Sequence, residues 1–119
     1  MTDEVRSQLV EAGVDVKSVM ERFMNNEALL ERFMRKFKND PNYQQLLEAV
    51  EAKENDKAFT AAHTLKGVAG NLSLSALQSQ VSAQCELFRG GNFEEGAAVM
   101  AQVTEEYERI TAAIDKVYP

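Results

Sequence analysis

The sequence predicts an all-α protein, an antiparallel four-helix bundle with short N-terminal helices packed across one end. Apolar residues recur every three or four positions along almost the whole chain, and no alternating stretch is long enough for a strand. Capping residues, glycines and prolines divide the chain into segments joined by short connections, which favour antiparallel neighbours. Because the chain has 119 residues and 45% of them are hydrophobic, we expect one core and a single domain over residues 1–119.

The N-terminal part is predicted to form two short helices that cover one end of the bundle. The first spans residues 3–11 and is stopped by Gly13. Asp15 then caps the second helix, whose apolar residues lie between Val16 and Phe23.

Two amphipathic helices follow. Leucine, phenylalanine and methionine recur at helical spacing over residues 29–37, and the basic residues just before Asn39 favour a helix end there. Asp40 is predicted to cap the next helix, with Pro41 at its first position and apolar residues from Tyr43 to Val50.

The second half of the chain is predicted to hold the three longest helices. A cap at Asn55 or Asp56 starts a helix that runs to about Leu72, and Ser73 or Ser75 begins the following one. Two glycines at positions 90 and 91 then break the pattern, and the asparagine at position 92 caps one long final helix. Its seam consists of Phe93, Ala97, Met100, Val103, Tyr107, Ile110, Ile114 and Val117.

The helix over residues 55–72 carries the clearest functional signal. At about 100° per residue, His63, the only histidine, shares one stripe with Lys66, Gly67 and Gly70. The opposite stripe is apolar and is predicted to pack inward: Ala58, Ala61, Ala62, Leu65, Val68, Ala69 and Leu72.

The two glycines on the histidine stripe indicate access to the imidazole. A glycine inside a helix costs roughly 1 kcal/mol relative to alanine, and packing of the far face does not account for two of them. A neutral imidazole nitrogen is a good nucleophile near pH 7, and absent side chains at Gly67 and Gly70 would let a bulky partner reach it. Lys66 could pair with an incoming phosphoryl group as a point charge.

The segment resembles the motif of histidine-containing phosphotransfer (HPt) domains of bacterial two-component phosphorelays. That motif is a histidine followed by a hydrophobic residue, lysine, glycine and a second small residue, which His63, Leu65, Lys66, Gly67 and Gly70 match. The resemblance extends upstream through residues 13–37, which are similar to the region before the histidine in that family.

The resemblance implies that the chain is a phosphoryl carrier, and it implies the classes of its partners. His63 would accept a phosphoryl group from a phospho-aspartate on one response-regulator receiver domain and pass it to an aspartate on another, while Lys66 offsets the charge. Sensor or hybrid histidine kinases are the other implied partner class, and no kinase activity or cofactor is expected of the chain itself. Ser73 stands where many members have glycine, so this sequence departs from the family pattern at the turn after the histidine helix.

Two neighbours of the stripe are further candidates for partner docking. Phe59 lies one turn before His63, where it could contact a docked partner or pack against a neighbouring helix. Thr64 flanks the stripe and could bind a phosphoryl oxygen or face water. The methionines at positions 20, 24, 34 and 100 fall on apolar faces and are predicted to fill the core.

Composition excludes several other functions. A net charge of −6 without a basic cluster argues against nucleic acid, and no apolar run reaches the roughly 20 residues that span a bilayer. We expect a cytoplasmic monomer. One histidine and one cysteine are too few for a zinc or di-iron site, and no phosphate-binding glycine loop is present. Cys85 is predicted to be a buried small hydrophobe.

The alternative from a different functional class is a helical adaptor or inhibitor that binds a histidine kinase or a receiver without carrying phosphate. His63 discriminates between the two, because an adaptor does not need it and a carrier does. A His63→Gln variant that retained signalling would favour the adaptor.

Overall fold

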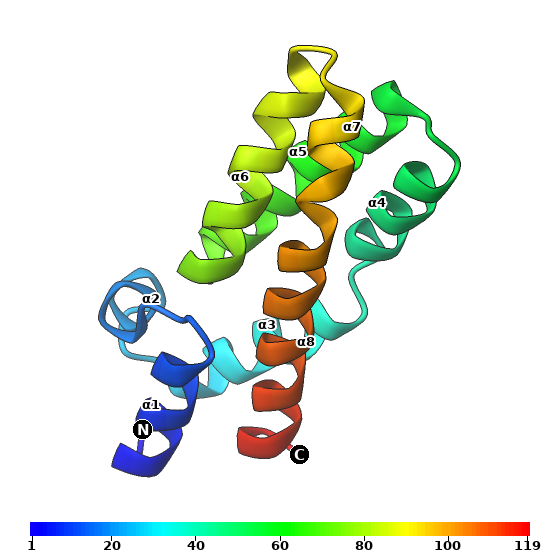
Figure 1. Cartoon of the computed structure of the whole chain (residues 1–119). Helices are drawn as coiled ribbons and strands as arrows, with labels where there is room; N and C mark the ends of the chain where they lie inside the picture. Colours follow the sequence, from blue (N-terminus) through cyan, green and yellow to red (C-terminus); the bar gives the residue numbers. More distant parts are fainter.

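The structure is a computed structural model that describes all 119 residues. It is all-helical and elongated, with extents of 43 × 22 × 20 Å. The chain forms eight helices, drawn in Figure 1: α1 (Asp3–Glu11), α2 (Val16–Arg22), α3 (Glu27–Lys38), α4 (Asn42–Glu51), α5 (Asn55–Asn71), α6 (Ser75–Arg89), α7 (Phe93–Ala98) and α8 (Met100–Val117).

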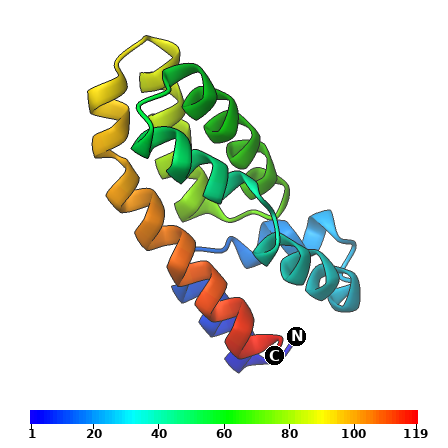
Figure 2. The same cartoon turned by 90° about the vertical axis from the view of Figure 1, so that its right-hand side faces the viewer.

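The four-helix bundle occupies one end of the molecule, as the sequence predicts. Helix α5 makes its most extensive contacts with α6 and α4, and α7 continues into the upper part of α8 to complete the bundle. The lower part of α8 extends beyond the bundle, where α1 runs beside it (Figure 2). Helices α1 to α3 therefore cover one end, and α8 joins that end to the bundle.

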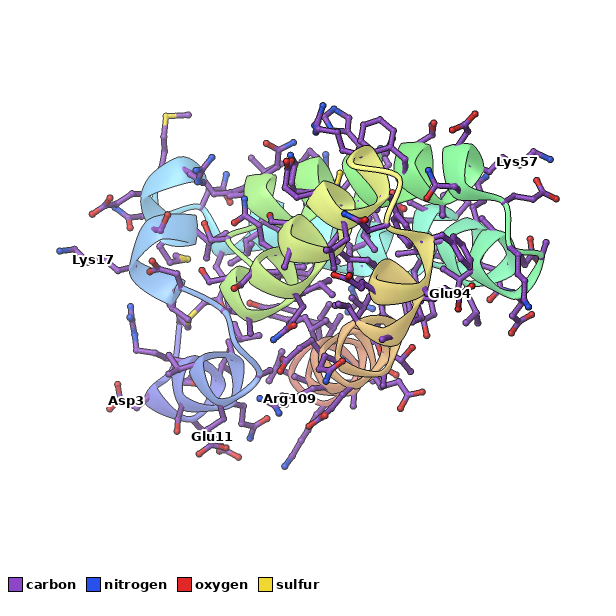
Figure 3. The ribbon with its side chains drawn as sticks, turned by 45° about the horizontal axis from the view of Figure 1, so that its top comes forward. Asp3, Glu11, Lys17, Lys57, Glu94 and Arg109 are labelled. Carbon is purple, nitrogen blue, oxygen red and sulfur yellow. The ribbon has the colours of Figure 1, made fainter.

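The core is one continuous cluster of 27 buried hydrophobic residues. Helix α5 contributes mostly alanines to it, which lets α4 and α6 approach the α5 backbone closely. Helix α8 contributes larger side chains along its whole length, from Met100 to Ile114. Charged residues lie outside, with Asp3 and Lys17 at the end formed by the N-terminal helices and Lys57 near the other end (Figure 3).

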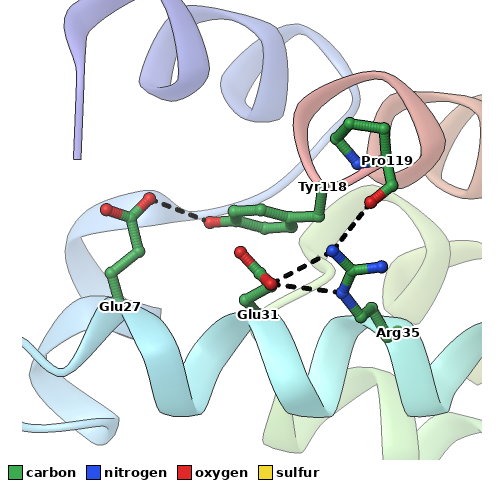
Figure 4. Close-up of polar contacts among 5 residues, drawn as sticks. All are labelled: Glu27, Glu31, Arg35, Tyr118 and Pro119. Carbon is green, nitrogen blue, oxygen red and sulfur yellow. Dashed lines mark hydrogen bonds and ion pairs between the residues drawn. The ribbon is translucent and has the colours of Figure 1, made fainter.

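Polar contacts hold the end of the chain against α3 (Figure 4). The hydroxyl of the buried Tyr118 donates a hydrogen bond to Oε2 of Glu27 at 3.1 Å. Arg35 donates to Glu31 at 3.1 Å and to the Pro119 carbonyl at 2.8 Å. These contacts fix the lower end of α8 against α3.

Some predicted caps are confirmed, and those of α4 and α5 are wrong. Helix α4 begins at Asn42 with Pro41 as its N-cap, so Pro41 is not its first residue and Asp40 is not its cap. The Asp40 carboxylate lies one residue further out, where it accepts the Asn42 amide at 2.9 Å. Asp15 accepts the Ser18 amide at 3.0 Å, as predicted. Neither Asn55 nor Asp56 caps α5, because the helix begins at Asn55 and its N-cap is Glu54. The Asn55 side chain instead donates to the Phe88 carbonyl at 3.0 Å, which links the start of α5 to the end of α6.

The turn after the histidine helix adopts the conformation that glycine prefers, although Ser73 occupies it. Ser73 has φ of +51°, a left-handed conformation that non-glycine residues adopt at a cost. Its buried hydroxyl donates to Oγ of Ser18 at 3.0 Å, and its carbonyl accepts the Asp15 amide at 2.9 Å. Side-chain and backbone contacts to α2 thus hold the left-handed turn, and α6 begins two residues later at Ser75, one of the two predicted starts.

The single long final helix was a wrong prediction, because the structure divides it at Val99 into α7 and α8. The fully buried Gln84 of α6 donates its amide to the Gly96 carbonyl at 3.1 Å. That carbonyl also accepts the Val99 amide, three residues on, at 3.2 Å. A side chain inserted into the hydrogen-bond ladder is a known cause of a helix break.

Three of the four methionines predicted to fill the core do so. Met20, Met34 and Met100 are buried. Met24 is 85% exposed, which contradicts its predicted place on an apolar face. The reason is local, since α2 ends at Arg22 and Met24 has φ of +52° in the turn that follows.

Candidate functional site

Helix α5 separates the two stripes as the sequence predicts. His63 and Gly67 are exposed, while Lys66 and Gly70 are half-buried beside them. On the opposite side, Ala58, Ala61, Ala62, Leu65, Ala69 and Leu72 are buried, and Val68 is half-buried. The packing of α4 and α6 against the alanine face therefore fixes the direction in which the imidazole points.

The two glycines have different surroundings. A Cβ at Gly67 would meet nothing within 4 Å, so the space one turn from His63 is open. A Cβ at Gly70 would lie 2.7 Å from Nε2 of Gln78 on α6. Access to the histidine accounts for Gly67, whereas close approach of α5 to a side chain of α6 contributes to the need for Gly70.

Phe59 links His63 to α6. Its half-buried ring stacks on the imidazole with the centroids 5.9 Å apart and the planes 24° from parallel. The guanidinium carbon of Arg89 lies 5.0 Å from the Phe59 ring centroid, within the range of a cation–π contact. Both alternatives weighed for Phe59 have structural support, because the ring packs toward α6 and still borders the open stripe.

Arg89 was not identified from the sequence, because it lies 26 positions after His63 on another helix. The signal that could have found it is the short connection between α5 and α6, which makes the helices antiparallel neighbours. In that arrangement the last turn of α6 lies beside the first turns of α5.

Thr64 is exposed, and its hydroxyl donates to the Thr60 carbonyl at 3.1 Å. This bond to the preceding turn is common for threonine within helices. Thr64 therefore lies at the border of the stripe. Its hydroxyl proton is used in the bond to Thr60, and its oxygen lone pairs face solvent.

A groove of about 440 Å³ lies beside the C-terminal half of α5. Its apolar side chains come from α3, from α5 with its C-cap, and from Phe23, the C-cap of α2; Phe33 is 41% exposed there. Two cations, Arg22 and Lys36, and one carboxylate, Asp40, also line it. The groove reaches α5 at Val68 and Asn71, so it lies to one side of the histidine stripe and none of the stripe residues lines it.

Cys85 of α6 is fully buried, as the sequence predicts. Burial raises the pKa of the Cys85 thiol, and the charges of Lys66 and Arg89 oppose this shift only in part. The thiol therefore stays protonated at neutral pH, and protonated buried thiols are poor nucleophiles.

We expect Cys85 in the native protein to react with a thiol reagent at pH 7.5 at least about 100 times more slowly than in the urea-unfolded chain. The reaction can be followed by the absorbance of Ellman's reagent. The Cys85→Ser variant is the blank for background colour. Rapid native labelling would contradict the burial of this thiol.

No three His, Cys, Asp or Glu side chains are grouped so that they could hold a metal ion. None of the helices is both long enough and apolar enough to cross a bilayer. A family model described as Hpt domain matches residues 28–113. Searches among curated proteins and among solved structures returned no match.

Proposed function

The chain belongs to the Hpt domain family, whose members act in phosphotransfer within phosphorelays, and on that basis we propose that His63 is the phosphoryl carrier. The observation that carries the proposal is the exposed imidazole beside the open space at Gly67. We propose further that the whole chain works as one unit, because α1 and α2 lie outside the matched segment and share its core.

The proposed reaction moves a phosphoryl group between an aspartate and His63. A ring nitrogen attacks the phosphorus of a receiver's aspartyl phosphate and forms a P–N bond. The P–O bond to the aspartate breaks, its electron pair returns to the carboxylate, and the second ring nitrogen releases its proton to solvent. The reverse sequence delivers the group to the aspartate of another receiver.

Lys66 supports both directions of this reaction. The phosphoryl group brings a charge of about −1.5 to −2, which a lysine in the next turn can partly neutralise. Because Lys66 is half-buried, its side chain has less freedom to leave the stripe than that of a fully exposed lysine. Magnesium, where the transfer requires it, would be held by the acidic pocket of the receiver.

The open surface around Gly67 and the apolar groove at Val68 suit a protein partner. A receiver domain must bring its aspartate within bonding distance of the imidazole, so its backbone must approach α5 closely. Gly67 offers no side chain to obstruct it, and the phenylalanines of the groove offer apolar contact area. A histidine kinase of the same pathway would charge the first receiver, and this chain would then act as a carrier without kinase activity.

The test is to incubate the protein with a panel of phosphorylated receiver domains. We expect acid-labile, base-stable phosphate on His63, located by intact mass and peptide mapping, and none on the His63→Gln variant. Circular dichroism of the variant controls for folding. Binding to receivers without any transfer would contradict the carrier proposal and favour an adaptor or inhibitor.

A further inference from the structure

A second cation contacts the aromatic ring that stacks on His63, and it has no part in the mechanism described above. Arg89 ends α6, and its guanidinium carbon lies 5.0 Å from the centroid of the Phe59 ring. The same ring stacks on the imidazole of His63 with a centroid distance of 5.9 Å. The guanidinium and the imidazole thus share the ring of Phe59 as a neighbour, and both side chains are exposed.

Arg89 is weakly held in this position. Its Nε donates to Oε1 of Glu86 at 3.2 Å, and the two side chains are 52% and 63% exposed. Exposed ion pairs of this kind contribute little to stability, so water readily replaces them. The two Nη atoms of Arg89 make no hydrogen bond in the protein, so their N–H donors are available to a ligand.

We propose that Arg89 is a phosphoryl-binding residue: after His63 is phosphorylated, the guanidinium leaves Glu86 and binds the phosphoryl oxygens through its Nη donors. This inference rests on the proposed role of His63 as the carrier. A phosphoryl group carries a charge of about −1.5 to −2 and three acceptor oxygens, whereas Glu86 offers one negative charge. Guanidinium groups bind phosphate through two parallel hydrogen bonds, which adds to the preference.

The neighbouring residues suit this exchange. Phe59 gives the guanidinium a surface along which it can move toward the imidazole without losing its aromatic contact. Lys66 approaches from the following turn of α5, so the phosphoryl group would be flanked by cations from two helices. Glu86 then acts as a competitor that holds Arg89 while His63 is unmodified.

The experiment measures the ionisation of the phosphoryl group itself. Phosphoramidate can phosphorylate a histidine without any protein partner: the ring nitrogen attacks phosphorus, the P–N bond of the reagent breaks, and ammonia leaves. Phosphorus NMR then gives the second pKa of the phosphoryl group, which is ordinarily about 6. A bound cation lowers that pKa because it favours the more highly charged form.

We expect Arg89→Gln to raise the phosphoryl pKa by about half a unit or more at low salt, and Arg89→Lys to restore part of the difference. Glu86→Gln should lower the phosphoryl pKa, because it removes the competing carboxylate. The differences should shrink in 1 M salt, where charges are screened beyond about 3 Å. Arg109→Gln is the matched control, since Arg109 is also an exposed arginine paired with a glutamate but lies on α8 beside Glu11 (Figure 3).

The outcomes separate this inference from the proposal on which it rests. If phosphoramidate places no phosphate on His63, the carrier role fails and this inference fails with it. If His63 is phosphorylated and Arg89→Gln leaves the phosphoryl pKa unchanged, only the role of Arg89 is overturned. Equal shifts for Arg89→Gln and Arg109→Gln would show an effect of net charge and would overturn it as well.

Discussion

Replacing Gly67 with leucine is expected to lower the rate of phosphoryl transfer from a phosphorylated receiver to His63 by at least about 100-fold, because the aspartate can no longer reach the imidazole. A Cβ at this position meets nothing within 4 Å, so the added side chain stands in the open space that a partner would occupy. The fold should be retained for the same reason. The measurement is the rate of phosphate appearance on the variant, followed by gel mobility or intact mass.

Two controls make the result specific for docking. Phosphoramidate is small, so it should still phosphorylate His63 in the Gly67→Leu variant at nearly the wild-type rate. Ala112→Leu places the same side chain on an exposed position of α8 and should leave transfer unchanged. Normal transfer from the receiver to Gly67→Leu would remove the proposed reason for a glycine at this position.

Replacing Gly96 with alanine is expected to destabilise the protein by about 1–3 kcal/mol, the usual effect of overpacking a core. A Cβ at Gly96 would lie 2.4 Å from Cε1 of Phe88, whose ring is buried and 1% exposed. The ring cannot move without disturbing the contact between α6 and α7. The same substitution at Gly67 is expected to stabilise the protein by about 0.5–1 kcal/mol, because that position is open and alanine favours the helix.

Urea denaturation of the two alanine variants measures both effects. Trimming the obstructing ring with Phe88→Leu should cost less stability in the Gly96→Ala background than in the wild type, which a double-mutant cycle would detect. A stabilising effect of Gly96→Ala, or additivity of the two substitutions, would contradict the predicted clash.

Caps illustrate where sequence reasoning succeeds and where it fails. Asp15 was identified correctly because an aspartate before an apolar repeat bonds its own helix, a local interaction within three residues. Asn55 has the same type of short polar side chain, yet it bonds a carbonyl of α6, 33 residues away in the sequence. The choice between the two partners depends on the position of α6, which local sequence does not specify.

Sequence reasoning likewise predicted one part of the candidate site and missed another. The spacing of His63, Lys66 and Gly67 placed them on one face of α5, since the helical period alone decides which residues share a face. The clash that Gly70 avoids with Gln78, and the contact of Arg89 with Phe59, arise between α5 and α6. Such contacts are visible only when the register between two helices is known.

The sequence by itself determined the all-helical class, the boundaries of most helices and the exposed histidine stripe with its buried alanine face. These features depend on periodicity and on bonds within one or two turns. Tertiary structure alone decided the break at Val99, where Gln84 of α6 binds the Gly96 carbonyl, and the left-handed turn at Ser73, where the carbonyl and hydroxyl of that residue contact α2 and its cap. A polar group takes the partner that the packed helices bring within hydrogen-bond distance, and local sequence does not define that distance.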